Sequence, residues 1–317
     1  MAYQDRWVRG AAPVTGDRDC AGRYEAIRSV VEPYNRQITV WDLGANLGYF
    51  GSRLANDFGA VSVMVEPRTD LIGICQANQL PTTIVLTHRL SVQDLRELAV
   101  SECPDLVLAL NVLHHFEDWR GALYNVLDLG CDLIIETPGL GDTGTANYET
   151  SQKILRLLED LSPQLILESP SHVTQGVKRP MYLIKCNKMA VTRGYAYGER
   201  VRTRGAHPVR PHEILSSRSV KSISYTDGET RPWVPGMNLW NWLQMGGSYP
   251  SRPTVQRAVV KATRDIKDHG DLRPWNMILQ GHSVKVIDAG HRKSVDDAKG
   301  LTDTIAWIAN PELAYVR

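Results

Sequence analysis

The sequence predicts an α/β fold for residues 1–186 and a smaller α+β unit for residues 187–317. Short apolar runs alternate with segments of helical periodicity in the first part, and this pattern ends near residue 186. The charge reverses at the same place. Residues 1–186 carry 16 basic and 23 acidic side chains, a net charge of −7, whereas residues 187–317 carry 20 and 12, a net charge of +8. A chain of 317 residues has room for about two domains, so we expect a domain boundary there.

The overall composition, 43% apolar and 22% charged, is that of a globular protein. No apolar run reaches the roughly 18 residues that span a membrane, and the N-terminus lacks the apolar segment of a signal peptide. The five cysteines have neither the spacing of a zinc site nor that of a disulfide framework. We therefore expect a cytoplasmic protein with buried thiols, with peripheral attachment to a membrane as the alternative. The sequence does not indicate the oligomeric state.

Seven short apolar runs in the first part are the predicted strands: 38–42, 61–65, 84–86, 106–110, 133–135, 164–167 and 181–184. Near-continuous apolar runs are typical of strands that are buried on both faces of a sheet. The segments between them have helical spacing, as at Tyr24, Ile27 and Val31. This alternation predicts a parallel sheet with right-handed crossovers. Such a sheet binds its ligand outside the carboxyl ends of the strands.

The first two predicted strands end in residues that suit a cofactor site. Asp42 ends the first strand, and Gly44 and Gly48 follow it; glycines can adopt positive φ and let a ligand lie against the backbone. Glu66 ends the second strand, 24 residues later, close to the spacing at which an acid holds a ribose diol. The pattern Asp-x-Gly-x-x-x-Gly lacks the tighter glycine loop that binds a pyrophosphate, which disfavours NAD. For Asp42, capping of the following helix is the alternative.

Three segments resemble motifs of the class I S-adenosylmethionine (SAM) methyltransferases. Residues 41–48 look like the first motif, 65–67 like the second and 105–116 like the segment at the fourth strand. The resemblance implies a seven-stranded Rossmann-like domain, SAM as the cofactor and methyl transfer as the reaction.

The same resemblance implies a set of cofactor-binding residues: Asp42, Gly44, Asn46, Gly48, Glu66, Asp94 and Asn111. Gly44 and Gly48 would flank the methionine part, Glu66 would hold the ribose and Asn111 would lie near the methyl donor. Asp94 comes late for the acid that the family often places near the adenine. A carboxylate at Asp94 would equally suit the first turn of a helix.

His114 and His115 are the catalytic candidates beside the expected transfer site, since histidine titrates near neutral pH and can act as a base. A structural role at the strand end is the alternative, because methyl transfer depends mainly on alignment and does not require a base. No Asn/Asp-Pro-Pro-Tyr/Trp segment follows the fourth strand, which disfavours an amino acceptor. By family likeness we expect an oxygen acceptor on a saccharide or a phosphorylated molecule.

The second part contains a pattern that suits phosphoryl transfer, which needs a carboxylate at the attacking hydroxyl and oxygen ligands for Mg²⁺. Asp271 and Asn276 have Asp-x-x-x-x-Asn spacing, and Asp288 follows. Residues 269–276 resemble the catalytic loop of aminoglycoside/choline-kinase-like proteins. The resemblance implies Asp271 as the catalytic base, Asn276 and Asp288 as metal ligands, and Mg-ATP as a cosubstrate.

The kinase-like part is short, because the chain has little room for a glycine-rich loop, a strand lysine and a helix glutamate before it. Either an active kinase or a non-catalytic module is open on this evidence. The fusion resembles the bifunctional methyltransferase–kinases that terminate bacterial O-antigen chains. Residues 188–221 carry eight basic and two acidic side chains, which fits a solvated linker or a surface for an anionic partner. No nucleic-acid-binding fold is visible, so nucleic acid ranks last among the partners.

Overall fold

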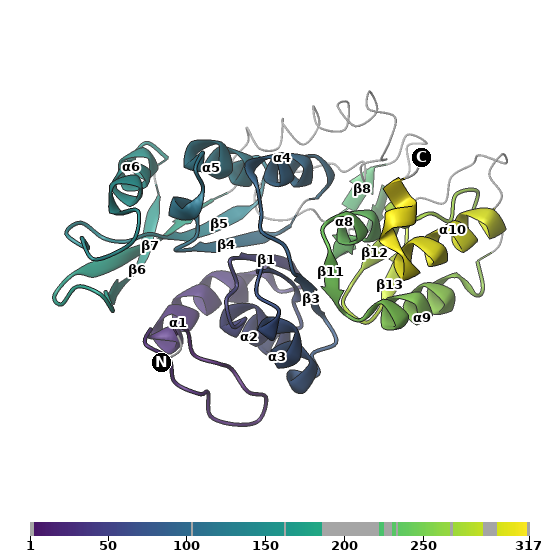
Figure 1. Cartoon of the computed structure of the whole chain (residues 1–317), viewed down its shortest axis with the longest axis horizontal. Helices are drawn as coiled ribbons and strands as arrows, with labels where there is room; N and C mark the ends of the chain where they lie inside the picture. The colour runs from purple at the N-terminus through teal and green to yellow at the C-terminus, as the bar shows by residue number, and fades with distance from the viewer. Residues whose placement is uncertain are drawn as a thin grey trace.

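An eight-stranded sheet forms the centre of the computed structural model (Figure 1). Its strands lie in the order β11-β3-β2-β1-β4-β5-β7-β6. The structure describes these residues: 3–102, 104–161, 163–185, 222–224, 230–232, 234–266, 269–287 and 297–315.

The strands of this sheet are β1 (Thr39–Leu43), β2 (Val61–Val65), β3 (Thr83–Leu86), β4 (Leu106–Leu110), β5 (Asp132–Glu136), β6 (Gln164–Pro170), β7 (Lys178–Ile184) and β11 (Gly247–Tyr249). The seven predicted runs overlap β1 to β7. Strands β1 to β5 run parallel to one another, which gives the large, mostly parallel sheet that the sequence predicts.

The sheet departs from the predicted parallel arrangement in two places. Strand β11, from the second part of the chain, is added as an eighth strand and pairs antiparallel with β3. Strand β7 runs antiparallel to both β5 and β6. Strand β6 lies at the edge and is largely exposed, so its apolar run does not mark a strand buried on both faces.

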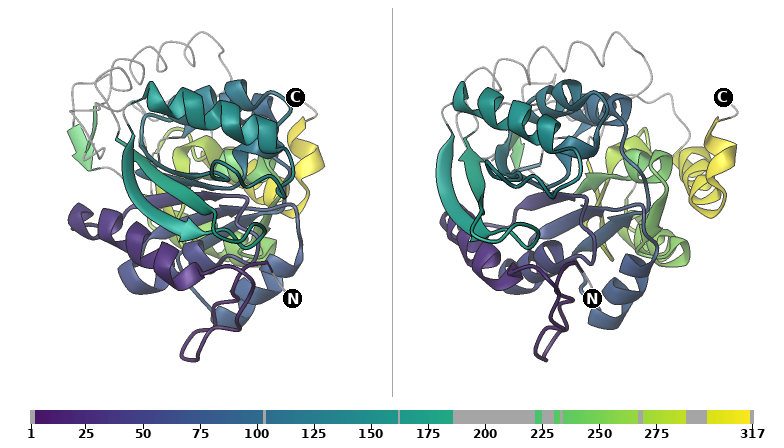
Figure 2. Two further views of the ribbon diagram at one scale, coloured as in Figure 1. Left: turned by 90° about the vertical axis from the view of Figure 1, so that its left-hand side faces the viewer. Right: turned by 60° about the vertical axis from the view of Figure 1, so that its left-hand side comes forward.

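Helices cover both faces of the sheet (Figures 1 and 2). Helices α1 (Cys20–Val31), α2 (Tyr49–Phe58) and α3 (Asp70–Asn78) lie on one face, and α4 (Val92–Ser101), α5 (Trp119–Leu127) and α6 (Tyr148–Glu159) on the other. Alternate residues of a strand point to opposite faces. Trp41 and Leu43 accordingly pack in the core under α4 and α5, whereas Val40 packs in the core under α1 and α2.

Helix α1 illustrates how local sequence sets these elements. The carboxylate of Asp19 caps the helix by accepting a hydrogen bond from the backbone N–H of Gly22. The predicted apolar face is confirmed, since Tyr24, Ile27 and Val31 are buried. Short 3₁₀ turns complete this part of the chain: η1 (Glu32–Tyr34) and η2 (Leu113–His115).

The second part of the chain lies against the β3 edge of the sheet (Figure 2). Its strands are β8 (Ser222–Ser224), β9 (Thr230–Pro232), β10 (Met237–Asn238), β12 (Met277–Leu279) and β13 (Val284–Val286), and its helices are α8 (Leu239–Gln244), α9 (Arg252–Thr263), α10 (Asp297–Ala309), η3 (Pro274–Asn276) and η4 (Pro311–Tyr315). Strands β10, β12 and β13 form a small sheet, and β8 pairs with β9.

The two parts share one hydrophobic core. Trp242 of α8 is fully buried in the same cluster as Leu95 of α4 and Ile84 of β3. Polar contacts join the parts as well: the N–H of Asn238 donates to Glu102 Oε1 at 2.9 Å. The expected boundary near residue 186 lies next to residues outside the described part of the chain, and it stays a prediction.

Two sequence expectations concern the chain as a whole. Cys20, Cys75 and Cys131 are buried, as predicted for these thiols. Within the described ranges, no helix has the length and apolarity to cross a membrane.

Candidate functional site

A cavity of about 1200 Å³ opens at the carboxyl ends of β1 to β5. The segment after each of these strands contributes lining residues: Gly44 and Asn46, Glu66 and Pro67, His88 to Val92, Asn111, Val112, His114 and His115, and Pro138 to Ala146 in part. This is the edge at which parallel sheets bind ligands, and the cavity covers the point between β1 and β4 where the strand order reverses.

The loop after β1 uses all of its backbone donors inside the protein. Each N–H from residue 44 to residue 49 donates to an internal acceptor. In order, the acceptors are Val65 O, Val65 O, Glu66 Oε2, Gln4 Oε1, Ala45 O and Gln4 Oε1. A pyrophosphate at a helix N-terminus needs free amides. The amides of residues 44–49 are all engaged in this way, in agreement with the absence of a dinucleotide-binding glycine pattern.

Both glycines of this loop have the positive φ that was predicted, 69° at Gly44 and 70° at Gly48. A Cβ at Gly44 would come within 2.8 Å of Val112 Cγ2, so a side chain there would disturb the cavity wall. Gly48 precedes the first residue of α2 and packs on Leu71 and Met64; it does not line the cavity. Gly44 therefore borders the ligand space, whereas Gly48 shapes the loop behind it.

Glu66 is fixed at the end of β2 and lines the cavity with 7% of its surface exposed. Oε2 accepts a hydrogen bond from the N–H of Asn46 at 2.8 Å, and Oε1 accepts one from the N–H of Arg68 at 3.2 Å. Each carboxylate oxygen can accept a second hydrogen bond. Glu66 can therefore receive the two donors of a vicinal diol without moving.

Asp42 fits both roles that the sequence suggests, a cap of the following helix and a residue of the cofactor site. Oδ2 accepts a hydrogen bond from the N–H of Gly51 in the first turn of α2 at 3.3 Å, and the residue also lines the cavity. The pKa of Asp42 is raised to about 7, mainly by burial; the charge of Glu66 also raises it, whereas the Gly51 hydrogen bond and Arg23 act in the opposite direction.

Two buried side-chain oxygens in the cavity wall have no donor among the residues that the structure describes: Asn46 Oδ1 and Asn111 Oδ1. Both residues hold positive φ, 55° and 59°, a conformation that few residues other than glycine and asparagine adopt. An unmatched buried acceptor costs about 1–3 kcal/mol, so a ligand with hydrogen-bond donors would remove this cost. The amino group and hydroxyl groups of SAM are such donors.

Asn111 is held by a buried ion-pair cluster that consists of Glu136, Arg18 and Arg23. Glu136, at the end of β5, is 1% exposed and accepts a hydrogen bond from Asn111 Nδ2 at 2.5 Å. Arg18 Nη2 lies 2.6 Å from Glu136 Oε1, and Arg23 Nη1 lies 3.1 Å from Oε2. Sequence reasoning missed these three residues, although an acid at a strand end was a signal that could have found Glu136.

His114 and His115 both line the cavity next to Asn111, and their rings lie 4.2 Å apart between centroids. Burial lowers the pKa of His114 to about 4, and the charges of His115 and Arg179 contribute to the same effect. Burial also lowers the pKa of His115, with a smaller contribution from Arg89. Neutral rings can hydrogen-bond a substrate hydroxyl. Their low pKa makes proton uptake unfavourable near pH 7, which favours a positioning role over that of a base.

Asp94 lies in the first turn of a helix, the position that the sequence suggests as the alternative to an adenine contact. It lies in the first turn of α4 and forms a capping box with Ser91. Its Oδ2 accepts hydrogen bonds from the N–H and Oγ of Ser91 and contacts His88 Nε2 at 3.0 Å. Asp94 does not line the cavity, whereas residues 88–92 do. The contact of Asp94 with an adenine stays a prediction.

In the second part, the structure brings Asp271 and Asn276 together. Asn276 Nδ2 donates to Asp271 O at 2.9 Å and to its Oδ2 at 3.0 Å, and Trp275 Nε1 donates to the same Oδ2 at 3.0 Å. Arg273 Nε lies 3.5 Å from Oδ1. The Asp271 carboxylate thus holds its own loop together. Asp288, the second of the two expected metal ligands, lies outside the described residues, as does the basic stretch 188–221.

Within the parts of the chain that the structure covers, no group of three or more His, Cys, Asp or Glu side chains is arranged to hold a metal ion. The metal site predicted at Asn276 and Asp288 stays a prediction.

Comparisons with known proteins give structural similarities at low sequence identity. No protein-family model matches the chain, and no curated protein matches it. Among solved structures, the bifunctional kinase-methyltransferase WbdD is similar with a TM-score of 0.45 and 18% identity, over 94% of this chain and 81% of WbdD. The N-methyltransferase NodS from Bradyrhizobium japonicum WM9 is similar with a TM-score of 0.40 and 14% identity, over 51% of this chain and 93% of NodS.

The N-terminal domain of EvdMO1, solved in the presence of SAH and D-fucose, also has a TM-score of 0.40 and 14% identity, over 57% of this chain and 91% of that domain. These structures include the same kinds of protein that the sequence motifs resemble, a methyltransferase fused to a kinase and single methyltransferases. All three TM-scores are below 0.5, and the function is therefore argued from the residues of the site.

Proposed function

We propose that the chain is a SAM-dependent methyltransferase that acts on an oxygen acceptor. One observation carries the proposal: Glu66, at the end of β2, is locked by the N–H of Asn46 in the loop after β1, and both residues line the same cavity. This arrangement presents acceptors for a ribose diol and leaves no loop amide for a pyrophosphate. It suits a nucleoside that is linked to a group without phosphate.

Different residues of the cavity wall would bind different parts of the cofactor. Glu66 would hold the ribose hydroxyls, and the free Oδ1 atoms of Asn46 and Asn111 would accept hydrogen bonds from the amino acid part. Residues 88–92 would border the adenine. When bound, SAM would supply an electrophilic methyl group on its sulfonium; the carbon–sulfur bond would break, and the proton of the acceptor hydroxyl would pass to solvent.

The chain would contribute alignment at the transfer point. Asn111, held by Glu136, and the neutral ring of His114 lie side by side in the cavity wall after β4. Fixing the acceptor and the methyl donor in line lowers the barrier by proximity, without a dedicated base. The acceptor oxygen would belong to a saccharide or to a phosphorylated molecule, as the resemblance implies.

Calorimetry with S-adenosylhomocysteine (SAH) tests the proposal on a matched pair of glycines. Gly44 and Gly59 both have positive φ, 69° and 62°, but a side chain at Gly44 meets Val112 in the cavity wall, whereas Gly59 has open space. Gly44→Arg should abolish SAH binding and Gly59→Arg should preserve it. Absence of SAH binding to the unaltered protein would refute the proposal.

Phosphoryl transfer from Mg-ATP is a second candidate, favoured by the contact between Asn276 and Asp271. ATP turnover that depends on Mg²⁺ and is lost in Asp271→Ala would support it. If the intact protein does not bind Mg-ATP, the second part of the chain has a non-catalytic role.

A further inference from the structure

We propose that Arg179 forms an anion-binding subsite in the acceptor part of the cavity, and that the methyl acceptor carries a carboxylate or a phosphate group beside the oxygen that is methylated. This inference rests on the proposed function, because it assigns the substrate class of the same cavity.

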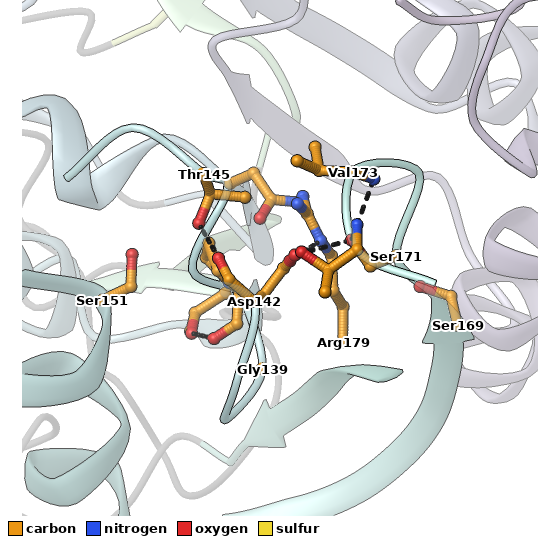
Figure 3. A network of polar contacts seen from close by, with 12 residues as sticks. Gly139, Asp142, Thr145, Ser151, Ser169, Ser171, Val173 and Arg179 are labelled. Carbon is orange, nitrogen blue, oxygen red and sulfur yellow. Dashed lines mark hydrogen bonds and ion pairs between the residues drawn. The ribbon is translucent and has the colours of Figure 1, made fainter. Parts of the chain in front are cut away.

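Arg179 lies at the start of β7 and lines the cavity, although only 2% of the residue is exposed. Its Nε donates to Asp142 Oδ2 at 2.6 Å (Figure 3). Its Nη2 is buried and has no hydrogen-bond partner among the described residues. A buried guanidinium that lacks a partner on one nitrogen costs free energy, and a ligand acceptor in the cavity would offset that cost.

The surroundings of Arg179 fix the direction of its guanidinium. Asp142 is fully buried in the loop after β5, and its Oδ1 accepts a hydrogen bond from Ser171 Oγ at 2.7 Å (Figure 3). Ser171 Oγ in turn accepts hydrogen bonds from the N–H groups of Val173 and Thr174. The loop after β5 and the turn between β6 and β7 therefore hold Arg179 by Nε and leave Nη2 for another acceptor.

The position of Arg179 points to the acceptor and away from the adenine end of the cavity. Its charge acts on His114, beside the expected transfer point, and on His172 in the turn after β6. His114 and His172 both line the cavity, as do Gly144 and Thr145 of the loop after β5. The adenine is expected at residues 88–92, which follow β3 on the other side of β1.

The buried ion pairs at this end of the cavity contain three guanidinium groups, Arg18, Arg23 and Arg179, and two carboxylates, Glu136 and Asp142. Burial lowers the pKa of His172 to about 4; Arg18 and Arg179 lower it as well, whereas Asp142 and Asp17 raise it. The pKa of His114 is similarly low. The two rings are therefore neutral at pH 7, and the positive charge at this end belongs to the guanidinium groups.

The planar guanidinium selects the chemistry of the ligand. Arginine binds carboxylate and phosphate groups through directional, charge-assisted hydrogen bonds that are shorter and stronger than neutral ones. Arg23 already donates to Glu136, and Arg18 donates to both Glu136 and Tyr3. Of these three residues, Arg179 is the one that lines the cavity and also has a buried guanidinium nitrogen without an identified partner among the described residues.

The test measures binding of inorganic phosphate and of acetate, at constant ionic strength, to the SAH-saturated protein by nuclear magnetic resonance of the anion. Arg179→Met would leave the buried carboxylate of Asp142 without a partner and could prevent folding. The double variant Arg179→Gln/Asp142→Asn removes both charges together. The matched control is Lys178→Gln/Glu168→Gln, which removes an exposed pair on the same hairpin.

We expect the unaltered protein to bind at least one of the two anions, the Arg179/Asp142 variant to bind it at least tenfold more weakly, and the control to bind it normally. SAH affinity should change by less than twofold in all three proteins. A preference for phosphate or for acetate identifies which anionic group the acceptor carries.

Three results would overturn the inference. The SAH-saturated protein could bind neither anion, or the Arg179/Asp142 variant could bind them unchanged; Arg179 would then only support the hairpin. Alternatively, the variant could lose SAH affinity at least tenfold, which would assign Arg179 to the cofactor carboxylate. Failure of the proposed function is a separate outcome, because in that case the unaltered protein would not bind SAH at all.

Discussion

The backbone N–H of Asn46 lies 2.8 Å from Oε2 of Glu66 and donates a hydrogen bond to it. This contact joins the glycine-containing loop after β1 to the end of β2, 20 residues further along the chain. It orients the carboxylate at the edge of the sheet where the cavity opens. The account of the cofactor site depends on this contact more than on any other.

Glu66→Ala should weaken SAH binding by roughly 10- to 100-fold, because hydrogen bonds to a charged group contribute about 1.5–3 kcal/mol. The loss should appear in calorimetry and should be accompanied by a lower melting temperature, because the N–H groups of Asn46 and Arg68 lose their acceptor. Glu25→Ala, at an exposed glutamate of α1, is the control and should bind SAH normally. Equal affinities of the two variants would contradict a ribose-binding role for Glu66.

Glu136→Ala should lower the free energy of unfolding by about 3–5 kcal/mol, because it leaves the buried cations of Arg18 and Arg23 without their partner. Chemical denaturation monitored by tryptophan fluorescence measures this change. Glu97→Ala, at an exposed glutamate of α4, should cost less than about 1 kcal/mol. A similar effect of the two substitutions would show that the Glu136 cluster does not support the site.

His114 should make the protein less stable in acid. Its pKa of about 4 in the folded state lies below the ordinary value of 6.5, so the unfolded state binds more protons between these values. The stability associated with neutral His114 is complete above pH 6.5 and is lost as the pH falls towards 4. Between pH 7.5 and 5, the unaltered protein should lose about 2 kcal/mol more than His114→Gln. Denaturant titrations at both pH values measure the difference, and parallel losses in the two proteins would contradict the buried, neutral state of His114.

Trp242→Ala should destabilise both parts of the chain together. Trp242 is fully buried and belongs to the core that also contains residues of β3 and α4. Loss of a buried tryptophan costs about 3–5 kcal/mol, and the shared core should spread this cost over one cooperative transition. Differential scanning calorimetry would show a single peak that moves to lower temperature. Two peaks, with only one displaced, would instead indicate independently folding domains with a boundary near residue 186.

Much of the fold follows from the sequence because the signals are local. The apolar runs predicted the positions of β1 to β7, and the glycine spacing predicted positive φ at Gly44 and Gly48. Strand β11 could not be predicted in this way, because Gly247–Tyr249 is a three-residue strand without an apolar run and depends on pairing with β3.

The site was only partly predictable for a related reason. Arg18 and Glu136 are 118 residues apart in the sequence, so no spacing rule connects them, and the same holds for Gln4 and the loop after β1. Asp94 shows the converse: a carboxylate near the right place in the sequence serves a helix cap, because Ser91 lies three residues before it. Local patterns predicted the strand-end residues, whereas the contacts that hold them depend on tertiary structure.

The most direct test of the central claim is a pair of calorimetric titrations of the intact protein, one with SAH and one with NAD. The amides of residues 44–49 are all occupied inside the protein, and Glu66 is free to accept a ribose diol. The account therefore predicts saturable SAH binding at one site and no detectable binding of NAD. Binding of NAD, or absence of SAH binding, would contradict it.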